Sequence, residues 1–139
     1  MNYFLLFGII LNNILLCRCT VHFERAVPVK IQSMCKPTVI SREGDICVTH
    51  CTNCKIVNVW NKSVLMTFSF EQFHAFINAT KTLEFDDYIE YHPDGTEVVI
   101  LASPFPDISL AFTRVEWYEF FAALDQAAYM QQIYSMVHS

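Results

Sequence analysis

Two segments of this chain repeat the same pattern at a spacing of 44 residues. The segments "VLMTFSFEQFHAFINA" (64–79) and "ISLAFTRVEWYEFFAA" (108–123) align without gaps. Each is an apolar strand that ends in Phe, followed by a hydroxyl residue able to cap a helix and by a helix with an aromatic face. Each unit must bury its apolar face, and the two can do so against each other on a shared sheet. The repeat therefore favours two helices packed on one sheet, although any amphipathic strand, cap and helix would resemble another.

The residues around these units have the pattern of short strands. Apolar and polar residues alternate or form β-branched runs in five further segments: 38–41, 46–50, 55–60 and the two arms of a hairpin over 88–103. The "HPDG" turn of that hairpin has Pro93 and Gly95 where a tight turn needs them. The helices are expected to begin after Ser69 and Thr113, each in a capping box. We predict a single α+β domain over residues 34–139, with an antiparallel sheet of about six strands and two helices.

The first 33 residues have two competing interpretations. The apolar run at the start is as long as that of a secretory signal, but no Lys or Arg precedes it and no small-x-small cleavage pattern follows. The alternative is that translation begins at Met34 and that residues 1–33 are a non-native upstream extension. We favour the start at Met34; an export signal or an ordered N-terminal element would be the other outcomes.

Charge and motif content argue against several function classes. From Met34 onward the chain has six Lys/Arg against thirteen Asp/Glu, and the basic residues do not cluster. We therefore expect no nucleic-acid partner, and no membrane partner unless residues 1–33 are a real export segment. No glycine-rich phosphate loop, GxSxG or HExxH motif is present. The chain carries no readable catalytic motif, so we lean towards a protein that is not an enzyme.

The most informative chemical feature is a group of four cysteines and one histidine. A structural zinc ion is bound by four Cys or His ligands, often including a CxxC pair. Cys51 and Cys54 form such a pair. Cys35 is the expected third ligand, with Cys47 or His50 as the fourth, because a hairpin over 38–50 would bring Cys35 to the far end of its second strand. The spacing thus predicts one structural zinc ion.

Three other interpretations of the cysteines stay open. A redox CxxC is typically found at a helix N-terminus, whereas Cys54 is followed by a predicted strand. Disulfides would require export, for which the acceptor patterns at Asn61 and Asn78 are weak support. Free cysteines can also pack as small apolar residues. The acidic stretch 84–97 could supply oxygen ligands to a metal, but a solvated hairpin is the simpler interpretation.

The "MCK…GDI…HCTNCKIV" run, with the "VLMTFSFEQFHAF" that follows, resembles an uncharacterised family of short bacterial proteins. Members share a start near "MC", a glycine-containing turn, a CxxC, a strand and a capped aromatic helix. The resemblance covers about Met34 to Val137 and implies importance for Cys35, Cys51 and Cys54, while Cys47 lies outside the pattern. It implies no particular activity.

Together these features predict a small intracellular, cytoplasmic binding module stabilised by zinc. Its partner is expected to be a protein, with a second copy of the chain as one candidate through the aromatic helix face. Two alternatives remain: an exported domain stapled by disulfides, and a thiol oxidoreductase using Cys51 and Cys54.

Overall fold

The computed structural model describes residues 36–138. The predictions for residues 1–33 and for Cys35 lie outside the described residues. The elements in chain order are β1 (Thr38–Glu43), β2 (Ile46–Cys51), β3 (Ile56–Asn61), β4 (Val64–Ser69), α1 (Phe70–Thr80), the 3-10 helix η1 (Phe85–Asp87), β5 (Ile89–Tyr91), β6 (Glu97–Ala102), β7 (Ser109–Phe112) and α2 (Arg114–Val137). The α+β class is confirmed.

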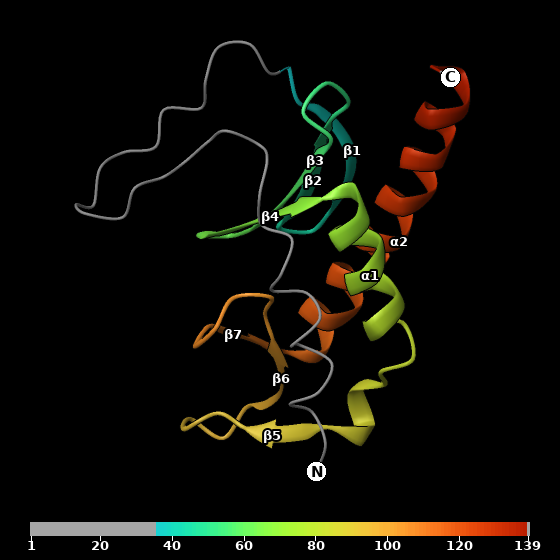
Figure 1. Ribbon diagram of the computed structural model, residues 1–139. Helices are drawn as coiled ribbons and strands as arrows, with labels where there is room; N and C mark the ends of the chain where they lie inside the picture. Colours follow the sequence, from blue (N-terminus) through green and yellow to red (C-terminus); the bar gives the residue numbers. More distant parts are fainter. Residues whose placement is uncertain (1–35, 139) are drawn as a thin grey trace, which may run out of the picture.

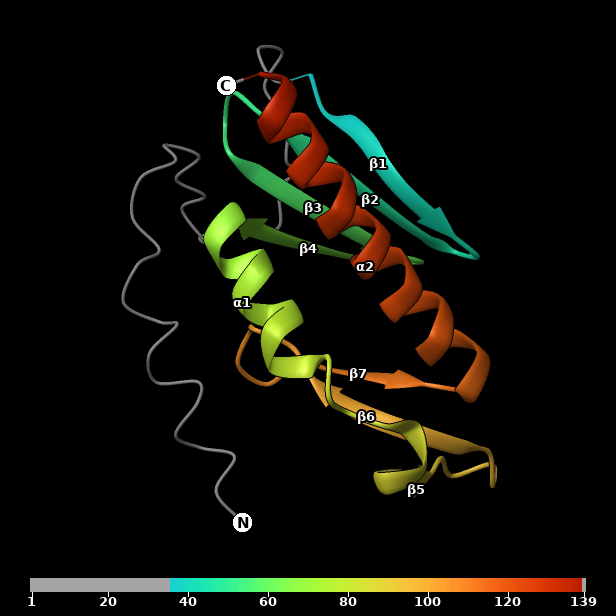
Figure 2. The ribbon, with the colours of Figure 1, turned by 90° about the vertical axis from the view of Figure 1, so that its right-hand side faces the viewer.

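The seven strands form two antiparallel sheets instead of one. The first has the order β1-β2-β3-β4 and the second has the order β5-β6-β7. Both are meanders, because each strand pairs with the next strand along the chain and short turns join them. Figure 1 shows the first sheet above the second, and Figure 2 shows both helices on the same side of the two sheets. The molecule therefore has two layers, with helices over one face of the strands.

The hairpin between β5 and β6 has the predicted turn. Gly95 adopts a φ of +89°, which glycine tolerates and other residues rarely do. The N–H of Gly95 donates to the carbonyl of His92 at 2.8 Å, and the backbone N–H of Thr96 donates to the Asp94 carboxylate at 2.9 Å. These two bonds close the turn between short strands.

Both predicted capping boxes are present. At the start of α1 the backbone N–H of Gln72 donates to Ser69 Oγ at 3.1 Å, and the Ser69 N–H donates to Gln72 Oε1 at 2.9 Å. At the start of α2 the Thr113 N–H donates to Glu116 Oε2 at 2.9 Å in the same way. Each box satisfies backbone donors that the first helical turn leaves without partners.

The repeated residues make equivalent contacts in the two units. The rings of Phe68 and Phe73 are 6.0 Å apart, and those of the matching pair Phe112 and Trp117 are 6.1 Å apart. The ring centroids of Phe76 and Phe68 are 5.4 Å apart, and those of the matching pair, Phe120 and Phe112, are 4.7 Å apart. The two repeated segments are thus alike in sequence and also in how their aromatic rings pack.

The two units meet at one pair of matching residues. Phe76 of α1 and Phe120 of α2 contact each other edge to face, with ring centroids 6.5 Å apart. Phe120 is fully buried, and burying a side chain of this size stabilises a fold by about 1.5–3 kcal/mol. The core of the molecule is therefore centred where the repeated helices face each other.

The long helix α2 joins the two sheets. It starts beside β7 and continues across the first sheet to β1 and β2 (Figure 2). Near its middle the Ser41 hydroxyl of β1 donates to Gln126 Oε1 at 2.9 Å. At its start Glu116 pairs with Lys62, which lies in the turn between β3 and β4. One helix thus contacts strands from both ends of the described chain.

Candidate functional site

The first sheet has one face that no described helix covers. Strand pairing places residues of four strands on this face, which we call the open face (Figure 1). Successive side chains of a strand point to opposite faces, so every second residue belongs to it. The open face consists of Val39, Arg42, Cys47, Thr49, Cys51, Ile56, Asn58, Trp60, Leu65, Thr67 and Ser69.

The open face is apolar at one end and contains no carboxylate. Trp60 is 38% exposed and its cross-strand neighbour Leu65 is 41% exposed. Arg42 is the one cation, and its Nη2 donates to Cys47 Sγ at 3.8 Å. In the middle row the Thr67 hydroxyl donates to Asn58 Oδ1 at 2.9 Å. Aromatic side chains are enriched in the contact surfaces of proteins, and here one is exposed beside an aliphatic side chain.

Three of the predicted site cysteines lie within the described residues. Cys47 and Cys51 are free thiols on the open face, with Cys47 partly exposed and Cys51 buried. Cys54 lies in the turn between β2 and β3 and is disulfide-bonded. Cys51 and Cys54 therefore do not form a free dithiol pair, and a turn and a strand, not a helix, follow them.

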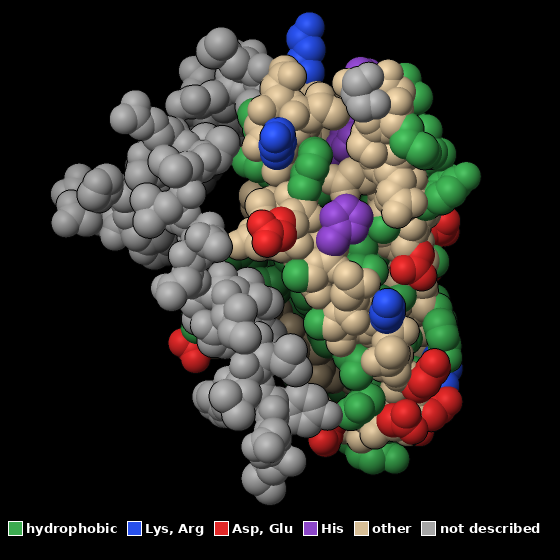
Figure 3. Space-filling view, turned by 45° about the vertical axis from the view of Figure 1, so that its right-hand side comes forward, with side chains coloured by type: hydrophobic (Ala, Val, Ile, Leu, Met, Phe, Trp, Pro, Cys, Tyr) green, Lys and Arg blue, Asp and Glu red, His purple; other side chains and the backbone are tan. Residues whose placement is uncertain are grey.

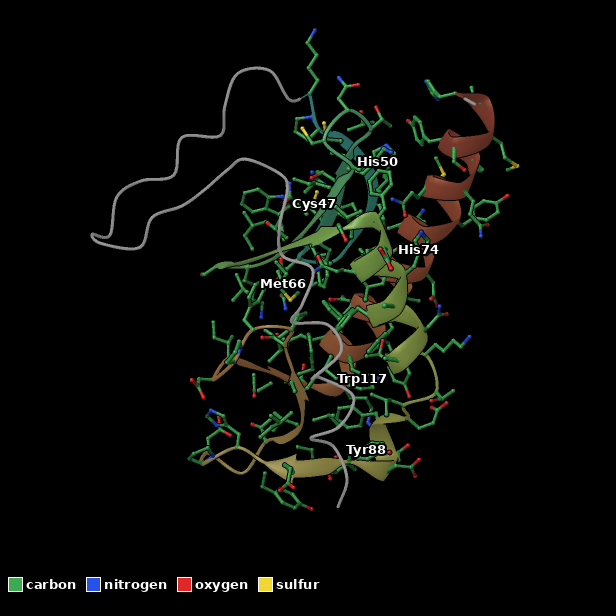
Figure 4. The ribbon with its side chains drawn as sticks, in the orientation of Figure 1. Cys47, His50, Met66, His74, Tyr88 and Trp117 are labelled. Carbon is green, nitrogen blue, oxygen red and sulfur yellow. The ribbon has the colours of Figure 1, made fainter. Side chains whose placement is uncertain are left out.

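His50 lies on the other face of the same strand. Its ring is 4.8 Å from Tyr134 of α2 and 6.1 Å from Phe70 of α1, so it points into the layer between sheet and helices. Figure 4 shows His50 on the helix side of β2 and Cys47 on the opposite side. The structure therefore separates His50 from the side chains of Cys47 and Cys51, because residues at odd and even positions of a strand point to opposite faces.

His50 is buried, and one of its ring nitrogens has no hydrogen-bond partner. The side chain is 2% exposed, and its Nδ1 has no partner. Burial lowers the pKa of His50, and the nearby His138 lowers it further, because a second positive charge there would be repelled. This imidazole is held neutral, inside the protein. His50 is thus a polar side chain packed against aromatic rings. The buried side-chain amide of Gln131 on α2 likewise has no hydrogen-bond partner.

No group of metal ligands forms among residues 36–138: no three His, Cys, Asp or Glu side chains gather closely enough to hold an ion. Cys35 lies outside this range, so the predicted set is not tested as a whole. Thr38 pairs with His50 in the β1–β2 ladder. The chain before β1 therefore enters at the end of the sheet where the Cys51–Cys54 turn lies.

The acidic stretch after α1 is a solvated surface with internal partners. Carboxylates gather at the end of the molecule formed by η1 and β5 (Figure 3). Arg114 pairs with Asp86 at 2.7 Å, and hydrogen bonds from Thr96 lower the pKa of Asp94 to about 2. These carboxylates form no metal site within the described residues.

Two hollows lie away from the open face. One, of about 270 Å³, separates the β3–β4 turn from β7, with the ion pair of Lys62 and Glu116 at its edge. The other, of about 160 Å³, lies where the end of α1 meets α2, beside Trp117 and Phe121. Two of the residues that line the second hollow, Trp117 and Phe121, already pack against each other, with ring centroids 4.6 Å apart.

The sequence analysis missed the residues that make the open face distinctive. Trp60 and Leu65 were assigned to strands, but their exposure was not foreseen. A usable signal was present in β3, where Val57 and Val59 alternate with Ile56, Asn58 and Trp60. The valines are fully buried and their neighbours are not. The alternation identifies two faces but does not say which face the helices cover.

Comparison with protein-family models, with curated protein sequences and with solved structures finds no match to this chain. Within residues 36–138 neither helix combines the length and the apolar character needed to cross a bilayer. Arguments about function therefore depend on the geometry of the molecule itself.

Proposed function

We propose that the protein is a small binding module that acts through protein contacts and not through catalysis. The observation that carries this proposal is the open face, where Trp60, Leu65 and Val39 are exposed on a sheet whose other face is covered. A surface with an exposed Trp is suited to binding, because large aromatic side chains dominate the energetics of protein interfaces.

The partner that fits this face best is a second copy of the chain. Residues 34–139 hold six Lys/Arg and thirteen Asp/Glu, so two copies repel each other over most of their surfaces. The open face has no carboxylate, and sheets of two copies can pack face to face about 10 Å apart. Self-association would therefore use the sheet, and not the aromatic helix face, whose rings are already buried between the two units.

The oligomeric state of the full chain tests this proposal. Light scattering between about 1 μM and about 1 mM should show a dimer that dissociates on dilution. Leu65→Lys should shift the chain to monomer, because it buries a charge in the contact. Tyr129→Lys is the matched control, since Tyr129 is 64% exposed on α2, away from the sheet. A chain that stays monomeric throughout, or equal effects of both variants, would contradict the proposal.

Tryptophan fluorescence gives a second, local measurement. Trp117 is 2% exposed and reports little change on association, whereas Trp60 would lose its contact with water. In a Trp117→Phe background the emission should shift to shorter wavelength as concentration rises. An unchanged spectrum in samples that do dimerise would show that the contact lies elsewhere.

A zinc-stabilised turn is a second candidate, supported by the place where Cys51 and Cys54 lie. Cys51 ends β2 and Cys54 follows it in the turn, and the start of β1 lies at the same end of the sheet. Cys35, three residues before β1, would then be the third ligand, and Cys47 would be the fourth. Zinc would require Cys54 as a thiolate, whereas its disulfide favours the exported, disulfide-stapled alternative.

Native mass spectrometry of protein from its own host separates these alternatives. One zinc mass that disappears on denaturation, with a melting temperature lowered by EDTA, would support the metal module. A melt unchanged by EDTA, with fewer titratable thiols than cysteines, would support the disulfide form. Either outcome leaves the proposal about the open face standing, because that face is formed by strand pairing.

A further inference from the structure

The last turns of α2 rest on the first sheet through few side chains. Beyond Gln131 no described residue of α2 is fully buried: Ile133 and Tyr134 are partly buried, and the others are exposed. The ring of Tyr134 contacts that of His50 in β2 edge to face, with centroids 4.8 Å apart. Figure 4 shows His50 on the side of β2 that faces the helices. The contact between Tyr134 and His50 is therefore one of the few that hold the end of α2 against the sheet.

Three side chains at this point form a row of rings, which we call the imidazole cluster: His50, Tyr134 and His138. The rings of Tyr134 and His138 are stacked, with centroids 5.9 Å apart. His138 Nδ1 lies 2.9 Å from the Tyr134 carbonyl oxygen, and because a carbonyl only accepts hydrogen bonds, this nitrogen is the donor. His138 is exposed and exchanges protons with solvent, so a positive charge can form one ring away from His50.

His50 itself has no neighbour that would stabilise a second proton on its ring. Its side chain is 2% exposed, and its Nδ1 has no hydrogen-bond partner. Burial lowers its pKa and repulsion from His138 lowers it further, and no carboxylate among the described residues acts in the opposite direction. Its neighbours carry no charge apart from His138; they are Phe70 of α1, Tyr134 and His138 of α2, and the cross-strand residues Thr38 of β1 and Val57 of β3. A protonated His50 is therefore stable only where water can reach it.

We infer that the end of α2, residues 132–138, is a proton-operated latch that packs on the first sheet while His50 is neutral and detaches when His50 takes up a proton. The proton comes from solvent and binds the ring nitrogen of His50 that carries no hydrogen. Detachment lets water reach the imidazolium and moves it away from His138, so both causes that disfavour the charge are removed. The rest of α2 stays packed, because Leu124 and Ala127 are buried in the core. The latch lies on the helix side of the sheet and does not depend on the open-face contact.

Amide hydrogen exchange of the full-length chain at pH 7 and pH 5 tests the latch. After correction for the intrinsic effect of pH on exchange, the protection of amides 133–138 should fall about fivefold to tenfold at pH 5. The protection of amides 117–127 should change less than about twofold. A uniform fall along the whole of α2 would indicate global unfolding, and an unchanged end would show that protonation does not move it. Either result would overturn the inference.

Two matched variants assign the response to His50. His50→Phe keeps an aromatic ring at this position and removes the titratable nitrogen, so the protection of the end of α2 should be the same at pH 5 as at pH 7. His74→Phe makes the same substitution at a partly buried histidine of α1, whose ring contacts Phe73 outside the imidazole cluster. Its pH response should equal that of the unchanged protein. A response that persists in His50→Phe, or that is lost equally in both variants, would contradict the latch.

A third variant changes the charge beside His50 without altering the buried layer. His138→Gln lies at an exposed position, so the fold should tolerate it. Without repulsion from His138 the attached form holds the His50 proton more easily, and the fall in protection at pH 5 should be about twofold smaller. An unchanged or larger fall would show that charge within the imidazole cluster does not drive detachment, and the inference would fail.

Discussion

The two strand–helix units follow the same local pattern but end in different surroundings. In each, a strand ending in Phe leads through a capping box into a helix with matching ring contacts. The first helix, α1, stops after 11 residues, whereas α2 continues for 24 and reaches β1 and β2. The comparison shows that the local sequence determines where both helices start. The surface available for packing determines how long each helix can be and still bury its apolar side chains. We expect the second unit to carry more of the stability.

The largest expected effect comes from the residues where the units meet. Phe120→Ala should lower the free energy of unfolding by about 3–5 kcal/mol, and Phe76→Ala by somewhat less, because Phe76 is 8% exposed and Phe120 is fully buried. Urea denaturation of both variants and of the double variant measures the coupling, expected at about 0.5–1.5 kcal/mol. Additive effects would show that the two units are energetically independent.

The caps offer a matched comparison of the two helix starts. Ser69→Ala and Thr113→Ala should each cost about 0.5–2 kcal/mol, because each leaves a backbone donor of the first turn unsatisfied. Thr113→Ala should cost more, since Glu116, its capping partner, also pairs with Lys62. Thermal unfolding measures both. A larger loss for Ser69→Ala would contradict the view that the second unit dominates.

The extended half of α2 contains a polar residue that the short helix lacks. Gln131 is 5% exposed, and neither its amide nitrogen nor its oxygen has a partner. Gln131→Leu should therefore raise the free energy of unfolding by about 1 kcal/mol, because it removes two buried polar groups without hydrogen bonds. Gln132→Leu, at the exposed neighbouring position, is the control and should change stability little. A destabilised Gln131→Leu would indicate an unseen partner for the amide.

The smallest expected effect is the pH dependence contributed by His50. Its pKa is lowered in the folded protein, so folding favours the neutral form. Stability from this group is complete above its unfolded value of about 6.5 and falls as the pH drops below it, because the unfolded chain then binds the proton more readily. His50→Phe should flatten this fall between pH 7 and pH 5, measured by urea denaturation. An identical slope in the variant would assign the acid sensitivity to other groups.

Much of the local structure was predictable because it depends on neighbouring residues. The strands at 38–41, 46–50, 55–60 and 64–68 match β1 to β4 within a few residues, and both capping boxes form. The short η1 helix was not predicted, since three residues carry no period. The expectation of one sheet of about six strands was wrong in its arrangement, because pairing between β4 and β7 depends on how the two units meet.

The candidate site was less predictable. The cysteine spacing drew attention to Cys47, His50, Cys51 and Cys54, but strand alternation separates His50 from the thiols. The assignment of metal, disulfide or free thiol depends on distances that spacing alone does not give. The open face had no sequence motif at all.

The sequence by itself determined the order of strands and helices, the residues that start each helix and the two repeated units. These features depend on contacts between residues close in the chain, such as caps, turns and alternation. Only the tertiary structure decided which sheet face the helices cover, that α2 extends from the second sheet to the first, and that the strands form two sheets instead of one. Those outcomes depend on contacts between residues far apart in the chain, such as Phe76 with Phe120 and Ser41 with Gln126, which no local pattern encodes.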